Sequence, residues 1–153
     1  MDRREFLIGC GVAVVTVPLS MVLNGSSVRE VKQMLDITAN DYWHYHFRFG
    51  ETTAYQPKTV GSGMINNVVM NTVVPLLFAY GKYHHESSFQ SKALQWLEKL
   101  PAESNAIVTR FRSFGVLAKN ASDTQSLIEL KTQYCDKKRC LDCAIANALL
   151  KKI

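Results

Sequence analysis

Residues 64–83 read MINNVVMNTVVPLLFAYGKY, and this stretch decides the fold. It is apolar on all sides, which is typical of a helix buried among other elements rather than one lying on a surface. Pro75 lacks a backbone N–H and crowds the preceding turn, so we expect it to kink or divide the helix. A membrane span is an alternative, but Asn66, Asn67 and Asn71 favour protein surroundings. The stretch therefore predicts a central core helix.

Helical patterns also lie on both sides of this central stretch. Residues 28–35 repeat apolar side chains at helical spacing behind an N-cap at Ser26 or Ser27, and residues 42–47 form a short aromatic helix. Residues 48–62 carry glycine and proline and are predicted to form a loop. Further helices are predicted over residues 87–100, from about 101 to 113, over 123–134, and from about 140 to 150.

No strand-like alternation of apolar and polar residues is evident in the sequence. The 153 residues are enough for one domain with a real core. The sequence therefore predicts an all-α fold, a single domain of about six helices packed around the hydrophobic central helix.

The N-terminus has the layout of an export signal. Arg3 and Arg4 precede residues 6–23, which carry no charge, and the Arg-Arg-x-Phe-Leu string resembles a twin-arginine signal. The uncharged run is just long enough to be considered as a membrane anchor, and any membrane contact is expected only there. A packed core helix and an accidental start are the alternatives. We expect an exported or inner-membrane protein if the signal is real and a cytoplasmic one otherwise, with residues 1–27 as a signal-like or anchor-like segment and 28–153 as the helical domain.

The net charge of +5 comes from the last third of the chain. Residues 1–106 carry nine Lys/Arg and nine Asp/Glu, whereas residues 107–153 carry nine Lys/Arg and four Asp/Glu. A basic patch can contact an acidic partner or nucleic acid, although an ordinary solvated helical surface is the commoner explanation. The candidate contact residues are Arg110, Arg112, Lys137, Lys138 and Arg139.

Three cysteines in a C-x4-C-x2-C array, Cys135, Cys140 and Cys143, surround the Lys-Lys-Arg run. A zinc site or an Fe–S cluster needs four ligands, so a fourth must fold back from elsewhere. The candidates for that fourth ligand are His84, His85, His44, His46 or an acidic residue.

Two other roles for the cysteines stay open. A helix N-terminus beside basic residues lowers the pKa of a thiol and favours redox chemistry, but the thioredoxin-like context is missing. Alternatively the thiols are small apolar side chains that pack between the last two helices. We weight packing first, a metal second and redox use third. His84 and His85 follow a helix end, where capping is a simpler role than metal binding.

An aromatic cluster within residues 42–55 could stack on a base or a sugar. At helical spacing such rings more often belong to the core. No nucleophile elbow, phosphate loop, zinc-protease motif or paired carboxylates are present. The sequence therefore predicts a protein that is not an enzyme.

Four motifs in order resemble the C-terminal part of the DUF2851 family, a bacterial family of unknown function. They are DYW…HFRFG at 41–50, NTVVPLLFAYG at 71–81, LEKLPAESN at 97–105 and YCDKKRCLDCAI at 134–145. The resemblance spans residues 28–150, and Ala146 stands where the family usually has glycine. It implies that a nuclease-like N-terminal region of longer members is absent and that the cysteine array is a family feature.

Our leading hypothesis is a non-catalytic helical binding or accessory module with a structural C-terminal cysteine cluster. The first alternative is a small zinc, Fe–S or redox protein that uses Cys135, Cys140 and Cys143. The second is a nucleic-acid-associated accessory domain.

Overall fold

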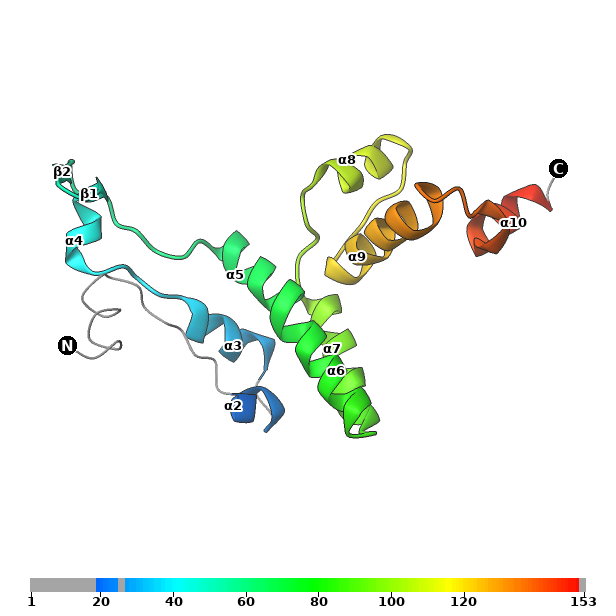
Figure 1. Ribbon diagram of the computed structural model, residues 1–153, viewed down its shortest axis with the longest axis horizontal. Coiled ribbons are helices and arrows are strands. Elements are labelled where there is room, and N and C mark those ends of the chain that lie inside the picture. Colours follow the sequence, from blue (N-terminus) through cyan, green and yellow to red (C-terminus); the bar gives the residue numbers. More distant parts are fainter. Residues whose placement is uncertain (1–18, 25–26, 152–153) are drawn as a thin grey trace. The chain divides into compact units, whose positions relative to one another are not determined.

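The computed structural model describes residues 19–24 and 27–151, which are mostly helical with one small two-stranded hairpin (Figure 1). The predicted helical fold class is confirmed. The contacts of the chain cluster into two compact units, Met1–Gln90 and Ser91–Ile153. The twin-arginine-like string lies outside the described residues.

The first unit contains short elements followed by one long helix. They are α2 (Leu19–Leu23), α3 (Val28–Leu35), α4 (Asp41–His44), β1 (His46–Arg48), β2 (Glu51–Thr52), α5 (Ser62–Val68), the π-helix η1 (Val69–Val73) and α6 (Val74–Tyr83). A capping box fixes the start of α3, since the Ser27 hydroxyl accepts the Glu30 N–H while the Glu30 carboxylate accepts the Ser27 N–H.

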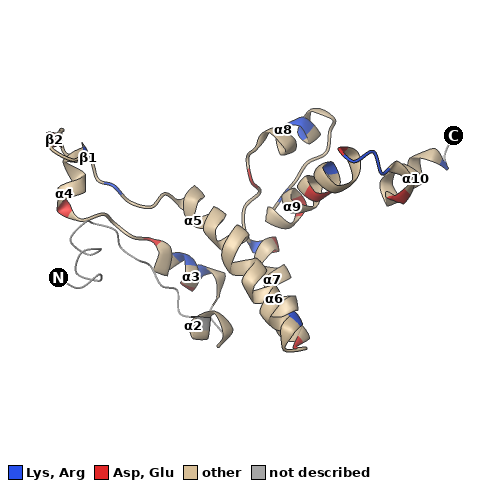
Figure 2. Ribbon diagram, viewed as in Figure 1, with Lys and Arg blue, Asp and Glu red and all other residues tan. Residues whose placement is uncertain are grey.

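The central helix is continuous through α5, η1 and α6, as Figure 2 shows by its nearly uncharged ribbon. Pro75 does not divide it, because the turn before the proline widens to a π-helix in which the Val74 N–H bonds to the Val69 carbonyl. Its buried side chains are Ile65, Val69, Met70, Val73, Val74 and Leu77. These confirm its predicted place in the core.

The same helix, Ser62–Tyr83, is the one helix in the described part of the chain that is long and apolar enough to cross a membrane. This conclusion rests on length and composition alone, and the core helix of a protein in water can be equally long and apolar.

The prediction of a helix over residues 42–47 and a loop over 48–62 is wrong in part. Helix α4 ends at His44, and β1 then pairs antiparallel with β2, with His46 opposite Thr52 and Arg48 opposite Glu51. Gly50 closes the turn at a φ of +78°, a conformation that glycine adopts without strain. The strands have three and two residues, too few to show an alternating pattern in the sequence.

The second unit holds most of α7 (Ser87–Lys99), followed by α8 (Ala106–Ser113), α9 (Ala121–Glu129), the π-helix η2 (Leu130–Cys135), the 3-10 turn η3 (Cys140–Asp142) and α10 (Ala144–Leu150). Helix α8 begins later than predicted, because Asn105 caps it by accepting the Val108 N–H at 2.9 Å. Asn120 caps α9 in the same way through the Asp123 N–H at 2.9 Å. The buried residues are Ala93, Trp96, Leu100, Val108, Ala121, Thr124 and Cys143.

Candidate functional site

The three cysteines of the array do not come together. Cys135 ends η2 and is exposed, Cys140 starts η3 and is exposed, and Cys143 precedes α10 and is buried. Among residues 19–24 and 27–151, no three His, Cys, Asp or Glu side chains gather closely enough to hold a metal ion. A ready-made zinc or Fe–S site of the expected kind is therefore not formed by the described residues. The physical reason is that the array spans a helix end, a turn and a helix start, so its side chains leave from three different elements.

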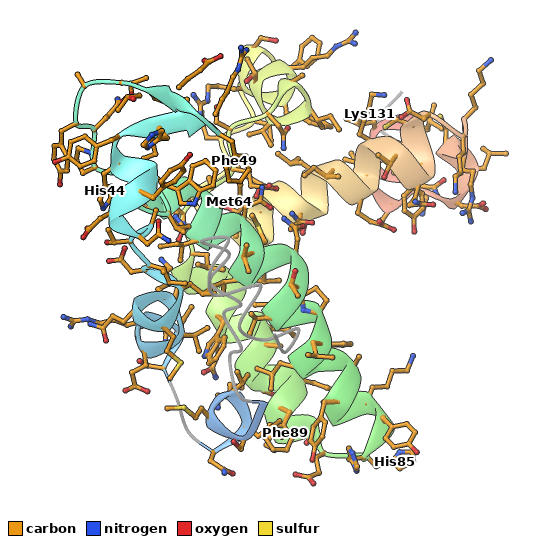
Figure 3. The ribbon with its side chains drawn as sticks, turned by 60° about the vertical axis from the view of Figure 1, so that its left-hand side comes forward. His44, Phe49, Met64, His85, Phe89 and Lys131 are labelled. Carbon is orange, nitrogen blue, oxygen red and sulfur yellow. The ribbon has the colours of Figure 1, made fainter. Side chains whose placement is uncertain are left out.

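His84 and His85 lie at the end of α6 in the first unit, where Figure 3 labels His85. The Glu86 N–H bonds to the Gly81 carbonyl at 2.8 Å, and the His85 N–H bonds to the Lys82 carbonyl at 3.4 Å. This pair of bonds is a Schellman motif, which ends a helix by placing one residue in the left-handed region. That residue is His85, with a φ of 58°. The expectation that these histidines follow a helix end is confirmed.

His44 is buried and has a structural role. Its Nδ1 accepts the backbone N–H of Lys58 at 3.0 Å, and its carbonyl accepts the Gln56 N–H at 2.8 Å. These bonds tie the segment after the hairpin to α4.

The basic run at 137–139 forms a second Schellman motif. The Arg139 N–H bonds to the Tyr134 carbonyl at 2.9 Å, and the Lys138 N–H bonds to the Cys135 carbonyl at 3.1 Å. Lys138 takes the left-handed position with a φ of 53°. The turn ends η2 and carries the positive charge that Figure 2 shows in blue between α9 and α10.

The basic residues differ in how far their charge is already matched. Arg139 pairs with Asp142 at 3.1 Å, and its guanidinium lies 5.4 Å from the centre of the Tyr134 ring. Lys131, which Figure 3 labels on the helix formed by α9 and η2, pairs with Asp136. No acidic partner is present within the described residues for Arg110, Arg112, Lys137 or Lys138, and Lys137 bonds to the neutral amide of Gln133.

Two of the cations open onto one small cavity of about 240 Å³, which we call the Arg110–Lys131 cavity. Its lining residues are Ile107, Arg110, Phe111, Phe114, Lys131 and Cys135. Those from α8 and its end follow the spacing i, i+3, i+4 and i+7, so they form one helical stripe. Lys131 and Cys135 lie four residues apart on η2 and form the facing stripe. The cavity thus combines positive charge with aromatic and aliphatic walls.

A larger, open groove of about 600 Å³ lies beside Cys143 in the same unit. Leu94 and Leu97 of α7, Leu127 and Leu130 of the following helix, and Ile145 of α10 supply its apolar lining. Cys135 and Cys143 therefore face different hollows.

The aromatic residues of the hairpin region are mostly exposed, so their expected place in the core is wrong. Phe47 is 63% and Phe49 is 73% exposed. Trp43 packs edge-on against Phe49 at 5.0 Å between ring centres, and the Lys58 ammonium lies 3.5 Å from the centre of the Phe47 ring. The hairpin cannot bury these rings because its strands are too short to pack against another layer.

Sequence reasoning selected Arg110 for this region but missed Ile107, Phe111, Phe114 and Lys131. The stripe on α8 is visible in the sequence as a helical repeat that includes a cation. Its pairing with η2 is not visible, because the two stripes are brought together only by the turn between α8 and α9.

Comparison with known proteins identifies one family. The family described as "Protein of unknown function (DUF2851)" matches residues 13–106. This range contains three of the four sequence motifs and ends before the cysteine array and before Arg110. No curated protein and no solved structure matches the chain.

Proposed function

Because the chain belongs to the DUF2851 family, whose function is unknown, we propose a function from the chain's own residues. We propose a non-catalytic accessory module that binds an acidic partner through the basic surface of its second unit. The five candidate contact residues of this surface are Arg110, Arg112, Lys137, Lys138 and Arg139.

The observation that supports this function best is the Arg110–Lys131 cavity. Cations that only solubilise a surface point separately into water, whereas Arg110 and Lys131 line one hollow with apolar walls. Less water inside such a hollow strengthens the attraction for an anion. Arg112, Lys137 and Lys138 are exposed and add attraction at longer range.

Binding of two acidic polymers, polyglutamate and single-stranded oligothymidylate, tests the proposal. A variant in which all five candidate contact residues are changed to Gln should bind either polymer more weakly and with a flatter salt dependence. Binding that is absent at low salt for both polymers, or that is equal for the variant and the wild type, refutes the proposal. Circular dichroism of the variant serves as the control for folding.

The role proposed for the cysteines is narrower than a cluster. Cys143 is 7% exposed and lies beside the apolar groove lined by Leu97 and Ile145, whereas Cys135 and Cys140 are exposed. We therefore assign the structural contribution to Cys143.

We also propose that residues 28–150 correspond to the C-terminal part of longer family members and that residues 1–27 direct export. The three ordered motifs within the matched residues 13–106 support the first idea, and the Arg3-Arg4 string supports the second. Mass spectrometry of the native protein measures its length. Fractionation of cells that express the wild type and an Arg3→Lys/Arg4→Lys variant tests export, and equal recovery of both proteins in the cytosol would refute it.

A further inference from the structure

We infer that the Arg110–Lys131 cavity binds an unpaired nucleotide, with its base against Phe111 and Phe114 and its phosphate between Arg110 and Lys131. This inference rests on the proposed function, because it names the acidic partner of the same surface. The nucleotide can be free or part of a single strand, and the two sources share this chemistry.

The aromatic walls select a nucleotide from among possible anions. An acidic peptide needs only cations, and an inorganic anion gains nothing from apolar contact. A nucleobase presents a flat π-face, which stacks on aromatic side chains whatever the base. Phe114 is 71% exposed at the end of α8 and Phe111 is half-buried one turn earlier, so both rings can be reached from solvent.

The two cations suit the phosphate of the same nucleotide. Arg110 is exposed and carries a planar guanidinium that can bond two phosphate oxygens at once. Lys131 is half-buried and offers a point charge from the opposite helix. The lining of this one cavity thus offers both base stacking and phosphate contact, the two components that single-strand binding proteins combine.

The ion pair between Lys131 and Asp136 opposes binding and provides a test with the opposite sign. The Lys131 and Asp136 side chains are 31% and 52% exposed, so their pairing is weakly held and a phosphate can compete for the ammonium. Removing the Asp136 charge should therefore tighten nucleotide binding. A cavity that binds no anion would not respond in this way.

Fluorescence anisotropy with labelled oligothymidylate and the full chain measures the effect of each residue. Phe114→Ala should weaken binding about tenfold and leave the salt slope unchanged, because stacking involves no counterions. Arg110→Gln should also weaken binding and should lower the slope by about 0.7, the value for one phosphate contact on a single strand. Asp136→Asn should bind more tightly.

Matched controls come from the same region. Leu117→Ala removes an apolar side chain that is 68% exposed, and Lys119→Gln removes one exposed positive charge. Neither residue lines the cavity. Equal losses for Phe114→Ala and Leu117→Ala, or for Arg110→Gln and Lys119→Gln, would overturn the inference.

Competition separates the possible ligands. Thymidine monophosphate that displaces the strand supports the site and identifies a free nucleotide as sufficient, whereas displacement only by longer strands supports a strand. Inorganic phosphate that competes as well as thymidine monophosphate overturns the inference, because the base then contributes nothing. If polyglutamate still binds in that case, the proposed function survives. If neither polymer binds at low salt, both ideas fail.

Discussion

Gly81, in the sequence FAYGKY, lies so close to neighbouring backbone that we expect a side chain there to destabilise the protein. Glycine normally weakens a helix by about 1 kcal/mol relative to alanine, so an exposed glycine in a helix should gain from Gly→Ala. Gly81 is buried in α6, and a Cβ there would lie 2.8 Å from the Glu86 carbonyl oxygen, 2.9 Å from the Phe89 Cβ and 3.0 Å from the Gln90 N. Two of these three atoms are backbone and cannot move without shifting the start of α7.

The expected effect of Gly81→Ala is a net loss of stability. Ordinary contacts of a Cβ begin near 3.4 Å, so the backbone after α6 must move by a few tenths of an ångström. Such overpacking costs about 1–3 kcal/mol, and contacts below 3.0 Å that involve backbone place this site in the upper part of that range, at about 2–3 kcal/mol. The gain in helix propensity offsets about 1 kcal/mol of this cost. We expect Gly81→Ala to lose about 1–2 kcal/mol, which corresponds to a fall of roughly 4–8 °C in Tm for each kcal/mol in a unit of this size.

Gly63→Ala is the matched control, because Gly63 lies in the first turn of α5 and has nothing within 4 Å of a Cβ. It should be neutral or gain up to about 1 kcal/mol. Urea and thermal unfolding followed by circular dichroism compare the two variants with the wild type. If Gly81→Ala is as stable as the wild type, or if both variants lose the same amount, the close packing of α6 on the start of α7 is refuted.

Two further predictions concern the helix end and the cysteines. Lys138→Gly should raise the free energy of unfolding by roughly 1 kcal/mol, because glycine adopts the left-handed conformation of Lys138 without strain. Urea unfolding measures the change, and a loss of stability would contradict the left-handed conformation at this turn. Cys143→Ser should lower the free energy of unfolding by about 1–2 kcal/mol, because it places a hydroxyl in a buried position. Cys140→Ser, at an exposed position, should change it by no more than about 0.5 kcal/mol. Equal losses in thermal unfolding would indicate that both cysteines hold a shared ligand.

Much of the fold could be predicted because helix formation is local. The apolar run at 64–83, an N-cap at Ser26 or Ser27 and the end of a helix before His84 all follow from residues within a few positions of each other. The structure confirms them and places the cap at Ser27. The start of α8 was predicted too early, because Pro101 also suits the first turn of a helix. Pro101 instead pairs with Asn120 in an isolated bridge, a partner that local sequence does not reveal.

The candidate site could be predicted only in part. Arg110 and the run at 137–139 were found because charge is written directly in the sequence. The separation of the three cysteines was not predicted. Their spacing would allow the thiols to meet at one metal, but the conformation of the backbone between them keeps them apart. The π-helix η2 and the left-handed Lys138 turn direct Cys135 toward one hollow, while Cys143 lines another.

The sequence by itself thus determined the helical class, the central apolar helix and the excess of positive charge in the last third, because each depends on composition or on contacts within a few residues. Only the tertiary structure decided that Arg110 shares a cavity with Lys131 and that the hairpin leaves Phe47 and Phe49 exposed. The physical reason is that the cavity arises from packing between segments distant in sequence, whereas the hairpin rings stay exposed because no distant segment packs on them. Such packing depends on shape and burial, which no local pattern records.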